Sequence, residues 1–231
     1  MVPVVFLHGI RMSGTMWRPV ASRSAAECRL PDFPGHGRRS GEGFTMDAAV
    51  EAVREEVEAL GGRAFLAGVS MGGFIGMEFL ARHPGMAAGF MGFGCTSRSR
   101  ALHGAFTAAA AVAARNSETV DRVSEYLVRK AVPGEPGRAM IEGGMHSEVL
   151  PDVVREVSAC DPLAALRGYG GPVWFVNGER DHFRSDEREF AHAARNSRLV
   201  LVPRAGHLTV FTRPRTMARL VDDAAVVASQ G

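Results

Sequence analysis

The sequence predicts an α/β fold in which a mostly parallel sheet is flanked by helices, and three observations support this prediction. Continuous apolar runs such as Val2–Leu7 indicate strands that are buried on both faces of a sheet. Segments with helical spacing of apolar residues separate these runs, which favours parallel strands joined by crossover helices. The third observation is the pattern Gly68-Val69-Ser70-Met71-Gly72, which is typical of a sharp turn between a strand and a helix. We expect six strands in all.

The first part of the chain alternates strands with helices. The run Val2–Leu7 ends at His8-Gly9, and the loop that follows leads to a helix expected over Thr15–Ala26. We expect Cys28–Phe33 to be an edge strand, because Pro31 has no amide hydrogen to donate within a sheet. The next elements expected are the helix 46–60, the strand 63–67, a helix from about 71 that stops before His83-Pro84, and the strand 89–94.

The alternation lapses between Ser97 and Ala159. The pattern there is helical, and Pro and Gly interrupt it at 133–137 and 143–144. Because this stretch is too long for a simple connection, we predict a helical cap at 97–159, inserted after the fourth strand into a core domain of residues 1–96 and 160–231. The elements expected after it are the strand 172–177, the helix 185–194, the strand 199–202 and the helix 213–228.

Composition excludes several classes of function. The 27 Lys and Arg residues nearly balance the 25 Asp and Glu residues, and no basic run alternates with aromatic residues, so we expect no nucleic-acid partner. No apolar run is long enough to span a membrane, and the N-terminus lacks a basic leader. Three scattered cysteines, Cys28, Cys95 and Cys160, argue against a disulfide framework or a zinc site. We therefore expect a cytoplasmic protein, monomeric or homodimeric, with a small-molecule substrate and no membrane partner.

The candidate catalytic residues follow predicted strands in the order serine, aspartate, histidine. Ser70 lies in the strand-to-helix turn, Asp181 follows the fifth strand, and His207 follows the sixth. A serine hydroxyl needs a histidine to accept its proton and a carboxylate to orient that histidine, and sites on parallel sheets gather at the carboxyl ends of strands. Glu179 and Asp186 are the alternative carboxylates. The sequence therefore predicts a Ser-His-Asp triad that needs no metal or organic cofactor.

These residues lie in motifs that resemble the α/β-hydrolase family over nearly the whole chain. The motifs are 4–9 with His8-Gly9, 31–38 with Ser40, 68–73, 177–181 and Gly206-His207. The resemblance implies the α/β-hydrolase fold, an oxyanion hole formed by the backbone amides of Ile10 and Met71, and a loop-shaping role for His8. It also implies that the insertion covers the site.

The start within the His-Gly strand resembles the plant methylesterase and hydroxynitrile lyase branch. Lyases of that branch typically carry threonine at the position of Gly9 and lysine at that of Leu208, so both positions favour ester hydrolysis here. The expected substrate is a small to medium, largely apolar carboxylic ester, lactone or thioester. A carbon-carbon bond hydrolase, a cofactor-free perhydrolase, a biosynthetic lyase or cyclase, and a non-catalytic ligand receptor remain open.

Candidate pocket residues come from segments expected near the nucleophile. Methionine and aromatic side chains would give an adaptable apolar cavity, and an arginine would suit an anionic group. The candidates are Gly9, Arg11, Met12, Trp17, Cys95 and Phe106. For the cap, we expect truncation of Phe106, Tyr126 or Leu127 to change substrate preference more than stability.

Overall fold

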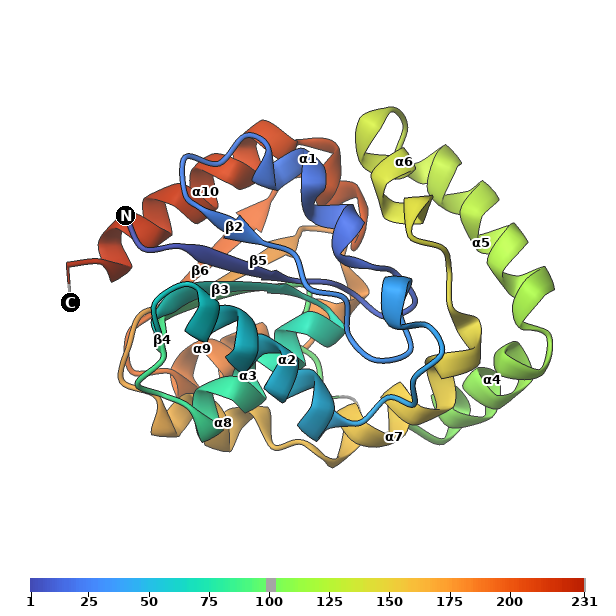
Figure 1. The fold of residues 1–231 in the computed structure, drawn as a ribbon, viewed down its shortest axis with the longest axis horizontal. Helices are drawn as coiled ribbons and strands as arrows, with labels where there is room; N and C mark the ends of the chain where they lie inside the picture. Colours follow the sequence, from blue (N-terminus) through green and yellow to red (C-terminus); the bar gives the residue numbers. More distant parts are fainter. Residues whose placement is uncertain (99–102, 231) are drawn as a thin grey trace.

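The computed structural model describes residues 1–98 and 103–230, and within them it forms a six-stranded parallel sheet with the order β2-β1-β3-β4-β5-β6 (Figure 1). The α/β fold and the six parallel strands are as predicted. The strands are β1 (Val4–Leu7), β2 (Cys28–Arg29), β3 (Ala64–Val69), β4 (Ala87–Phe93), β5 (Val173–Gly178) and β6 (Ser197–Val202).

The register of the central strands brings their carboxyl ends to one edge. Leu7 of β1 pairs with Gly68 of β3, and Val69 at the end of β3 pairs with Phe93 at the end of β4. Phe93 in turn pairs with Val176 of β5. The residues that follow these strands therefore emerge side by side, which is where a site forms in a parallel sheet.

Helices cover both faces of the sheet, as expected for right-handed crossovers. One face carries α2 (Met46–Ala59), α3 (Met71–Arg82), α8 (Pro162–Gly168) and α9 (Glu187–Ala193). The other carries α1 (Arg18–Ala21), preceded by the 3₁₀ helix η1 (Gly14–Trp17), and α10 (Pro214–Ala228). Among the described residues, no helix is both long and apolar enough to cross a membrane.

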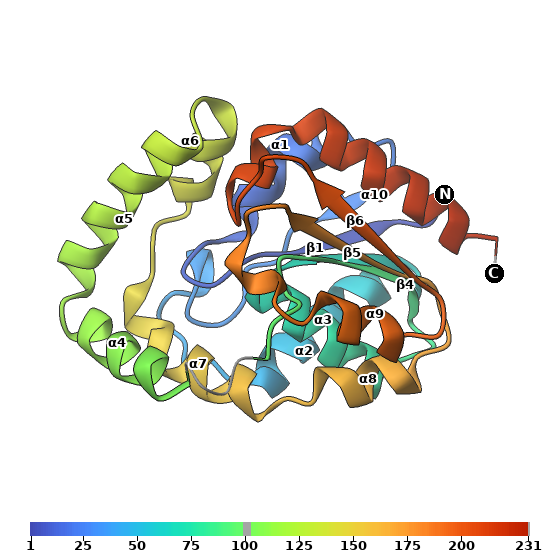
Figure 2. The ribbon, with the colours of Figure 1, turned by 180° about the vertical axis from the view of Figure 1, so that it is seen from behind.

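The helical insertion, residues 97–159, holds four helices in its described part. They are α4 (His103–Arg115), α5 (Ser117–Ala131), α6 (Glu135–Glu142) and α7 (Leu150–Ala159), with the 3₁₀ helix η4 (Ser147–Val149) before α7. In Figures 1 and 2, α4, α5 and α6 arch past the edge at which the strands end. The helical pattern read from this stretch is thus confirmed, whereas its separateness as a domain stays a prediction.

Buried residues of the helical insertion extend the apolar core on both faces of the sheet. Val149 and Val153 belong to the cluster beneath α2 and α3. Val128, Val132 and Met140 belong to the cluster on the α10 face, and Met140 is fully buried. The insertion is therefore packed onto the core at two places, through residues 128–140 on one face of the sheet and through η4 and α7 on the other.

Two early elements are shorter than predicted. The helix expected over Thr15–Ala26 ends at Ala21, where the side chains of Ser22 and Arg23 both donate to the carbonyl of Pro19 and the amide of Arg23 donates to the carbonyl of Val20 instead. The strand expected over Cys28–Phe33 pairs only at its first two residues. Pro31 then prevents further pairing, as its missing amide requires.

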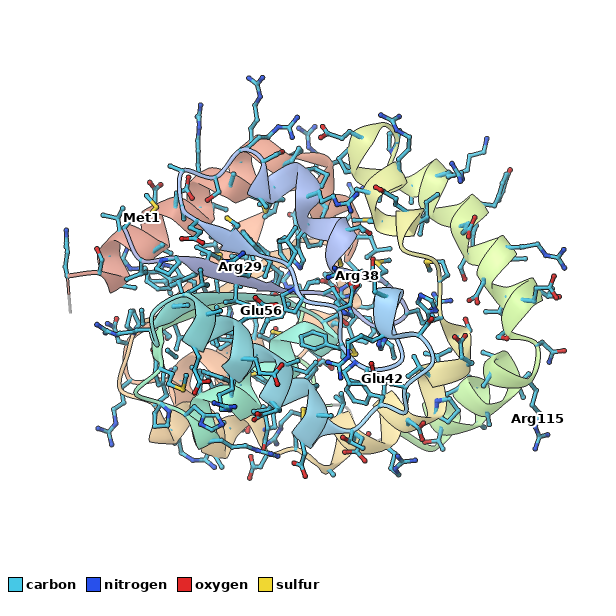
Figure 3. All side chains as sticks on the ribbon, viewed as in Figure 1. Met1, Arg29, Arg38, Glu42, Glu56 and Arg115 are labelled. Atoms are coloured by element: carbon cyan, nitrogen blue, oxygen red, sulfur yellow. The ribbon has the colours of Figure 1, made fainter. Side chains whose placement is uncertain are left out.

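Charged side chains of both signs are interspersed over the surface (Figure 3). Arg29 of β2 lies 3.9 Å from Glu56 of α2, and Arg39 pairs with Glu42 at 2.6 Å. Exposed pairs of this kind each contribute only about 0–1 kcal/mol. The fold therefore depends on its apolar clusters and not on these pairs.

Candidate active site

Ser70 occupies a strained turn between β3 and α3. Its φ of 52° and ψ of −116° lie outside the regions that non-glycine residues favour. The Ser70 amide donates to the carbonyl of Phe93 at 2.9 Å, and its own carbonyl accepts from the amides of Gly73 and Phe74. Such strain persists only where the surroundings hold the backbone, which these hydrogen bonds do.

Close packing around this turn depends on two glycines. A Cβ on Gly68 would lie 2.3 Å from the carbonyl oxygen of Gly72, and a Cβ on Gly72 would lie 2.3 Å from that of Leu7. Both contacts are with backbone, which has little freedom to move. Only glycine therefore allows β1, β3 and α3 to approach this closely.

We expect Gly72→Ala to lower the free energy of unfolding by about 3 kcal/mol, because the added methyl group must displace the backbone at the end of β1. Gly85→Ala is the matched control, since a Cβ there meets nothing within 4 Å. Urea denaturation of both variants measures the difference. Equal stability of the two variants would contradict the close approach described here.

Asp181 and His207 form a hydrogen-bonded pair. His207 Nδ1 lies 2.9 Å from Asp181 Oδ2, and Asp181 Oδ1 accepts from the amide of Phe183 at 2.8 Å. Burial opposes ionisation of Asp181, but its hydrogen bonds and the nearby histidine outweigh this effect, so its pKa lies below the usual value. The ionised carboxylate fixes the tautomer of His207 with the proton on Nδ1 and leaves Nε2 as a base.

The acid–histidine pair packs against Gly94, directly after β4. A Cβ on Gly94 would lie 2.6 Å from Asp181 Oδ2 and 2.7 Å from His207 Nδ1. Gly94 follows Phe93, whose carbonyl accepts from the Ser70 amide, so the pair and Ser70 are neighbours at one edge of the sheet. Within the described residues no hydrogen bond joins Ser70 to His207; such contacts often tighten only around a substrate.

The candidate oxyanion amides lie beside Ser70. A Cβ on Gly9 would lie 3.9 Å from the Cβ of Ser70, which places the loop containing Ile10 next to Ser70. Met71 begins α3, where helix amides have no intrahelical partner. Across residues 1–98 and 103–230, neither the amide of Ile10 nor that of Met71 donates a hydrogen bond. The part of both amides in an oxyanion hole stays a prediction.

His8 supports the loop that contains Gly9 and Ile10 through two hydrogen bonds. Its Nε2 accepts from the amide of Phe33 at 3.0 Å, and its Nδ1 donates to the carbonyl of Gly9 at 2.9 Å. Burial lowers the pKa of His8 to about 4, so the ring is neutral. These contacts fit the loop-shaping role expected for it.

Asp32 is a supporting residue that sequence reasoning did not single out. Its Oδ1 accepts from the amide of Gly14 at 2.8 Å, and its Oδ2 accepts from the amide and the Nε of Arg38 at 3.1 Å. Burial opposes its ionisation, but these donors lower its pKa overall. Its position in the motif 31–38 was the available signal.

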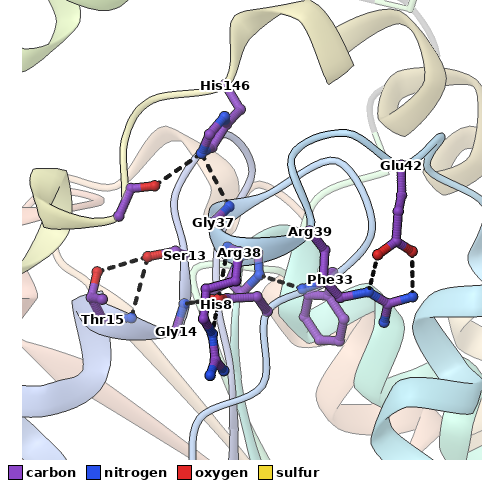
Figure 4. A network of polar contacts seen from close by, with 12 residues as sticks. His8, Ser13, Gly14, Thr15, Phe33, Gly37, Arg38, Arg39, Glu42 and His146 are labelled. Atoms are coloured by element: carbon purple, nitrogen blue, oxygen red, sulfur yellow. Dashed lines mark hydrogen bonds and ion pairs between the residues drawn. The ribbon is translucent and has the colours of Figure 1, made fainter.

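The helical insertion also contacts this support. Figure 4 shows His146 reaching the turn after β2, where its Nε2 lies 3.0 Å from both the amide of Gly37 and the carbonyl of Gly143. Ser13, which caps η1, and Thr15 of η1 are hydrogen-bonded to each other at 2.7 Å, and both are drawn in the same view. The turn after β2 is therefore hydrogen-bonded to the insertion, and the start of η1 is held by its own side chains.

The other pocket candidates lie in different parts of the structure. Met12 and Trp17 are buried in the α10-side core, and the Trp17 indole donates to the carbonyl of Leu7. Cys95 is buried behind the turn, and burial raises its pKa. Phe106 belongs to α4, but its side chain lies outside the described part of the structure. The contribution of these four residues to a pocket stays a prediction.

Arg11 reaches the helical insertion, where its Nη1 contacts Ser124 and Ser147.

The part of the chain that the structure describes contains no group of three histidine, cysteine or acidic side chains arranged to hold a metal.

Comparison with known proteins places the chain among hydrolases. A model of the alpha/beta hydrolase family matches residues 4–220. BpoC of Mycobacterium tuberculosis H37Rv, whose name assigns it provisionally to the non-heme bromoperoxidases, is 28% identical over 236 residues, which cover 93% of this chain and 90% of BpoC. The BpoC crystal structure superposes with a TM-score of 0.80 and 24% identity, over 99% of this chain and 93% of that chain.

Two further solved structures share the fold. A thermophilic esterase from Thermogutta terrifontis superposes with a TM-score of 0.79 and 19% identity, over 99% of this chain and 90% of that chain. The enol-lactonase from Burkholderia xenovorans LB400 superposes with a TM-score of 0.78 and 20% identity, over 98% of this chain and 92% of that chain. The expected likeness to the plant methylesterase branch stays a prediction. The family match over most of the sequence, together with this fold, shows that the chain belongs to the alpha/beta hydrolase family.

Proposed function

We propose that this hydrolase cleaves a small to medium, largely apolar carboxylic ester, lactone or thioester through a covalent acyl-enzyme. The observation that carries the proposal is the Asp181–His207 hydrogen bond, packed against the strand end that also holds the Ser70 amide. A base oriented by a buried carboxylate, next to a serine in a strained turn, is the arrangement that acyl transfer requires.

In the proposed mechanism, Ser70 Oγ attacks the substrate carbonyl while His207 Nε2 accepts the hydroxyl proton. The amides of Ile10 and Met71 stabilise the oxyanion, and His207 then returns the proton to the departing alcohol or thiol. Water deacylates the enzyme by the same steps in reverse order, with His207 again as the base. Asp181 stabilises the imidazolium that forms in each half of the reaction.

The direct test is a turnover assay with p-nitrophenyl esters of two to eight acyl carbons, together with a matched lactone and a matched thioester. A fluorophosphonate should abolish turnover and add to Ser70, as peptide mapping would show. The absence of turnover on all three bond types, with no labelling at Ser70, would favour the ligand-receptor alternative and overturn the proposal.

The name of the relative BpoC, which refers to a bromoperoxidase, favours hydrogen peroxide as a second acceptor of the acyl group. Hydrogen peroxide in place of water would attack the same acyl-enzyme and release a peracid, while His207 takes the proton of the attacking peroxide and delivers it to the departing Ser70 oxygen. Adding hydrogen peroxide to the ester assay and titrating the peracid tests this function. Release of the carboxylic acid alone would exclude it.

The helical insertion is proposed to act as a cap, and helix geometry separates its candidate residues. On α5, Leu127 lies about 60° around the helix axis from Ser124, which contacts Arg11, whereas Tyr126 lies about 160° away. Leu127 is 57% exposed and Tyr126 is 59% exposed. Leu127 therefore borders the side that faces the core, and Tyr126 points outward.

We expect Leu127→Ala to shift the preferred acyl chain length, changing relative kcat/KM along the ester series by about threefold to tenfold. Tyr126→Ala, for which the sequence alone predicted a change in substrate preference, becomes the matched control because its side chain points outward, and it should change neither preference nor melting temperature. An unchanged chain-length profile in Leu127→Ala would show that α5 does not line the substrate pocket.

Met140→Ala, by contrast, should cost about 2–5 kcal/mol of stability, because Met140 is fully buried.

A further inference from the structure

Arg11, the residue that follows the proposed oxyanion amide of Ile10, connects the oxyanion loop to the helical insertion. Its Nη1 donates to Ser124 Oγ of α5 at 2.8 Å and to Ser147 Oγ of η4 at 3.2 Å. Its backbone carbonyl accepts from the amide of His146 at 3.0 Å. Both the side chain and the backbone of Arg11 are therefore bonded to the insertion.

The partners of Arg11 are themselves held in place. Ser147 is fully buried, and its Oγ donates to Asp121 Oδ1 at 2.5 Å. Burial lowers the pKa of Arg11, and the negative charge of Asp121 opposes this effect. Asp121 and Ser124 lie three residues apart on α5, so the guanidinium meets one face of that helix.

The backbone of Arg11 is unusual for an arginine. The amide of Met12 donates to the carbonyl of Gly9, which closes a turn with Arg11 in its third position and a φ of 65°. Turns with a positive φ at that position favour glycine, and another residue there costs about 1–3 kcal/mol. The chain thus carries arginine where the backbone alone would favour glycine, which points to a role for its side chain.

We propose that Arg11 is a positioning residue through which the helical insertion sets the place of the Ile10 amide in the oxyanion hole. The inference rests on the proposed function and extends it. Ile10 lies between Gly9, whose carbonyl is bonded to His8 and Met12, and Arg11, whose carbonyl and side chain are bonded to the insertion. With the second anchor lost, the amide would no longer lie where charge develops on the substrate oxygen.

The test compares a p-nitrophenyl ester with its thionoester, in which sulfur replaces the carbonyl oxygen. Sulfur is larger and a weaker hydrogen-bond acceptor, so an intact oxyanion hole favours the ester, and a misplaced amide reduces that preference. We expect Arg11→Gln and Arg11→Gly to lower kcat for the ester about tenfold, with KM within about twofold, and to reduce the ester-to-thionoester ratio about fivefold. Ser124→Ala should move both quantities in the same direction by less.

Arg122→Gln is the matched control. Arg122 lies on α5, as Ser124 does, but its side chain is 71% exposed and faces Glu118. It should leave the ester-to-thionoester ratio unchanged. Should Arg11→Gln fold poorly, Arg11→Gly, which relieves the strained turn, and Ser124→Ala decide the question. A wild-type ratio in the folded Arg11 variants would overturn the inference while Ser70-dependent turnover still stands. Absence of turnover in the wild-type enzyme would instead overturn the proposed function and the inference with it.

Discussion

Ser70→Ala is expected to lower kcat/KM for any ester substrate by about 10⁵- to 10⁶-fold, because in the proposed mechanism its hydroxyl forms the acyl-enzyme. Oxyanion stabilisation and substrate binding would account for the remaining rate over water. Steady-state assays at high enzyme concentration, with melting temperature recorded in parallel, measure the change. The melting temperature should stay close to that of the wild type, since alanine keeps the backbone of the turn.

Ser97→Ala is a suitable control for this variant. Ser97 follows β4 at the same edge of the sheet, and its hydroxyl contacts Ser185 at 2.9 Å. This substitution should leave turnover unchanged. Turnover that survives in Ser70→Ala at more than about one part in a hundred, together with fluorophosphonate labelling of another residue, would move the nucleophile elsewhere.

Asp181→Asn is expected to lower kcat by about 10⁴-fold, because an amide in place of the carboxylate favours the wrong tautomer of His207. The side-chain oxygen of asparagine can still accept the hydrogen bond from the amide of Phe183, so stability should change little. Measuring kcat for one ester across neutral to alkaline pH, with circular dichroism to monitor folding, checks both statements.

Glu179→Gln and Asp186→Asn are the controls for the acid. Glu179 Oε2 accepts from the amide of Arg204 at 2.8 Å, and Asp186 Oδ2 accepts from the amide of Arg98 at 2.6 Å, so each carboxylate serves a nearby loop. Neither substitution should reduce turnover by more than about threefold. If one of them equals the loss expected for Asp181→Asn, that residue orients the histidine instead.

The sequence was sufficient to predict the features that depend on short stretches of backbone. Gly68 and Gly72 mark the close approach at the turn, and the positions of Ser70, Asp181 and His207 after strands follow from local apolar patterning. Such patterns are visible without tertiary information. The six parallel strands and the helical insertion were predictable for the same reason.

Contacts between distant segments could not be predicted. Arg11 meets Ser124 across 113 residues, and Asp32 supports Gly14 from another loop, although neither pairing leaves a periodic pattern in the sequence. Trp17 illustrates the same limit, because the loop could have turned its indole toward a pocket or into the core. In the structure the indole is buried and packs against Phe6, a contact that the sequence does not reveal.

The way the helical insertion shares the core has a consequence for evolution and engineering. Val153 of α7 packs in the cluster on one side of the sheet and Met140 of α6 in the cluster on the other. A chimera that exchanges the whole insertion for that of another hydrolase would break both clusters at once and should aggregate or melt early. If the insertion caps the site as proposed, exposed positions of α5 such as Val123 and Leu127 are the better places for substitutions, because variation there leaves both clusters intact.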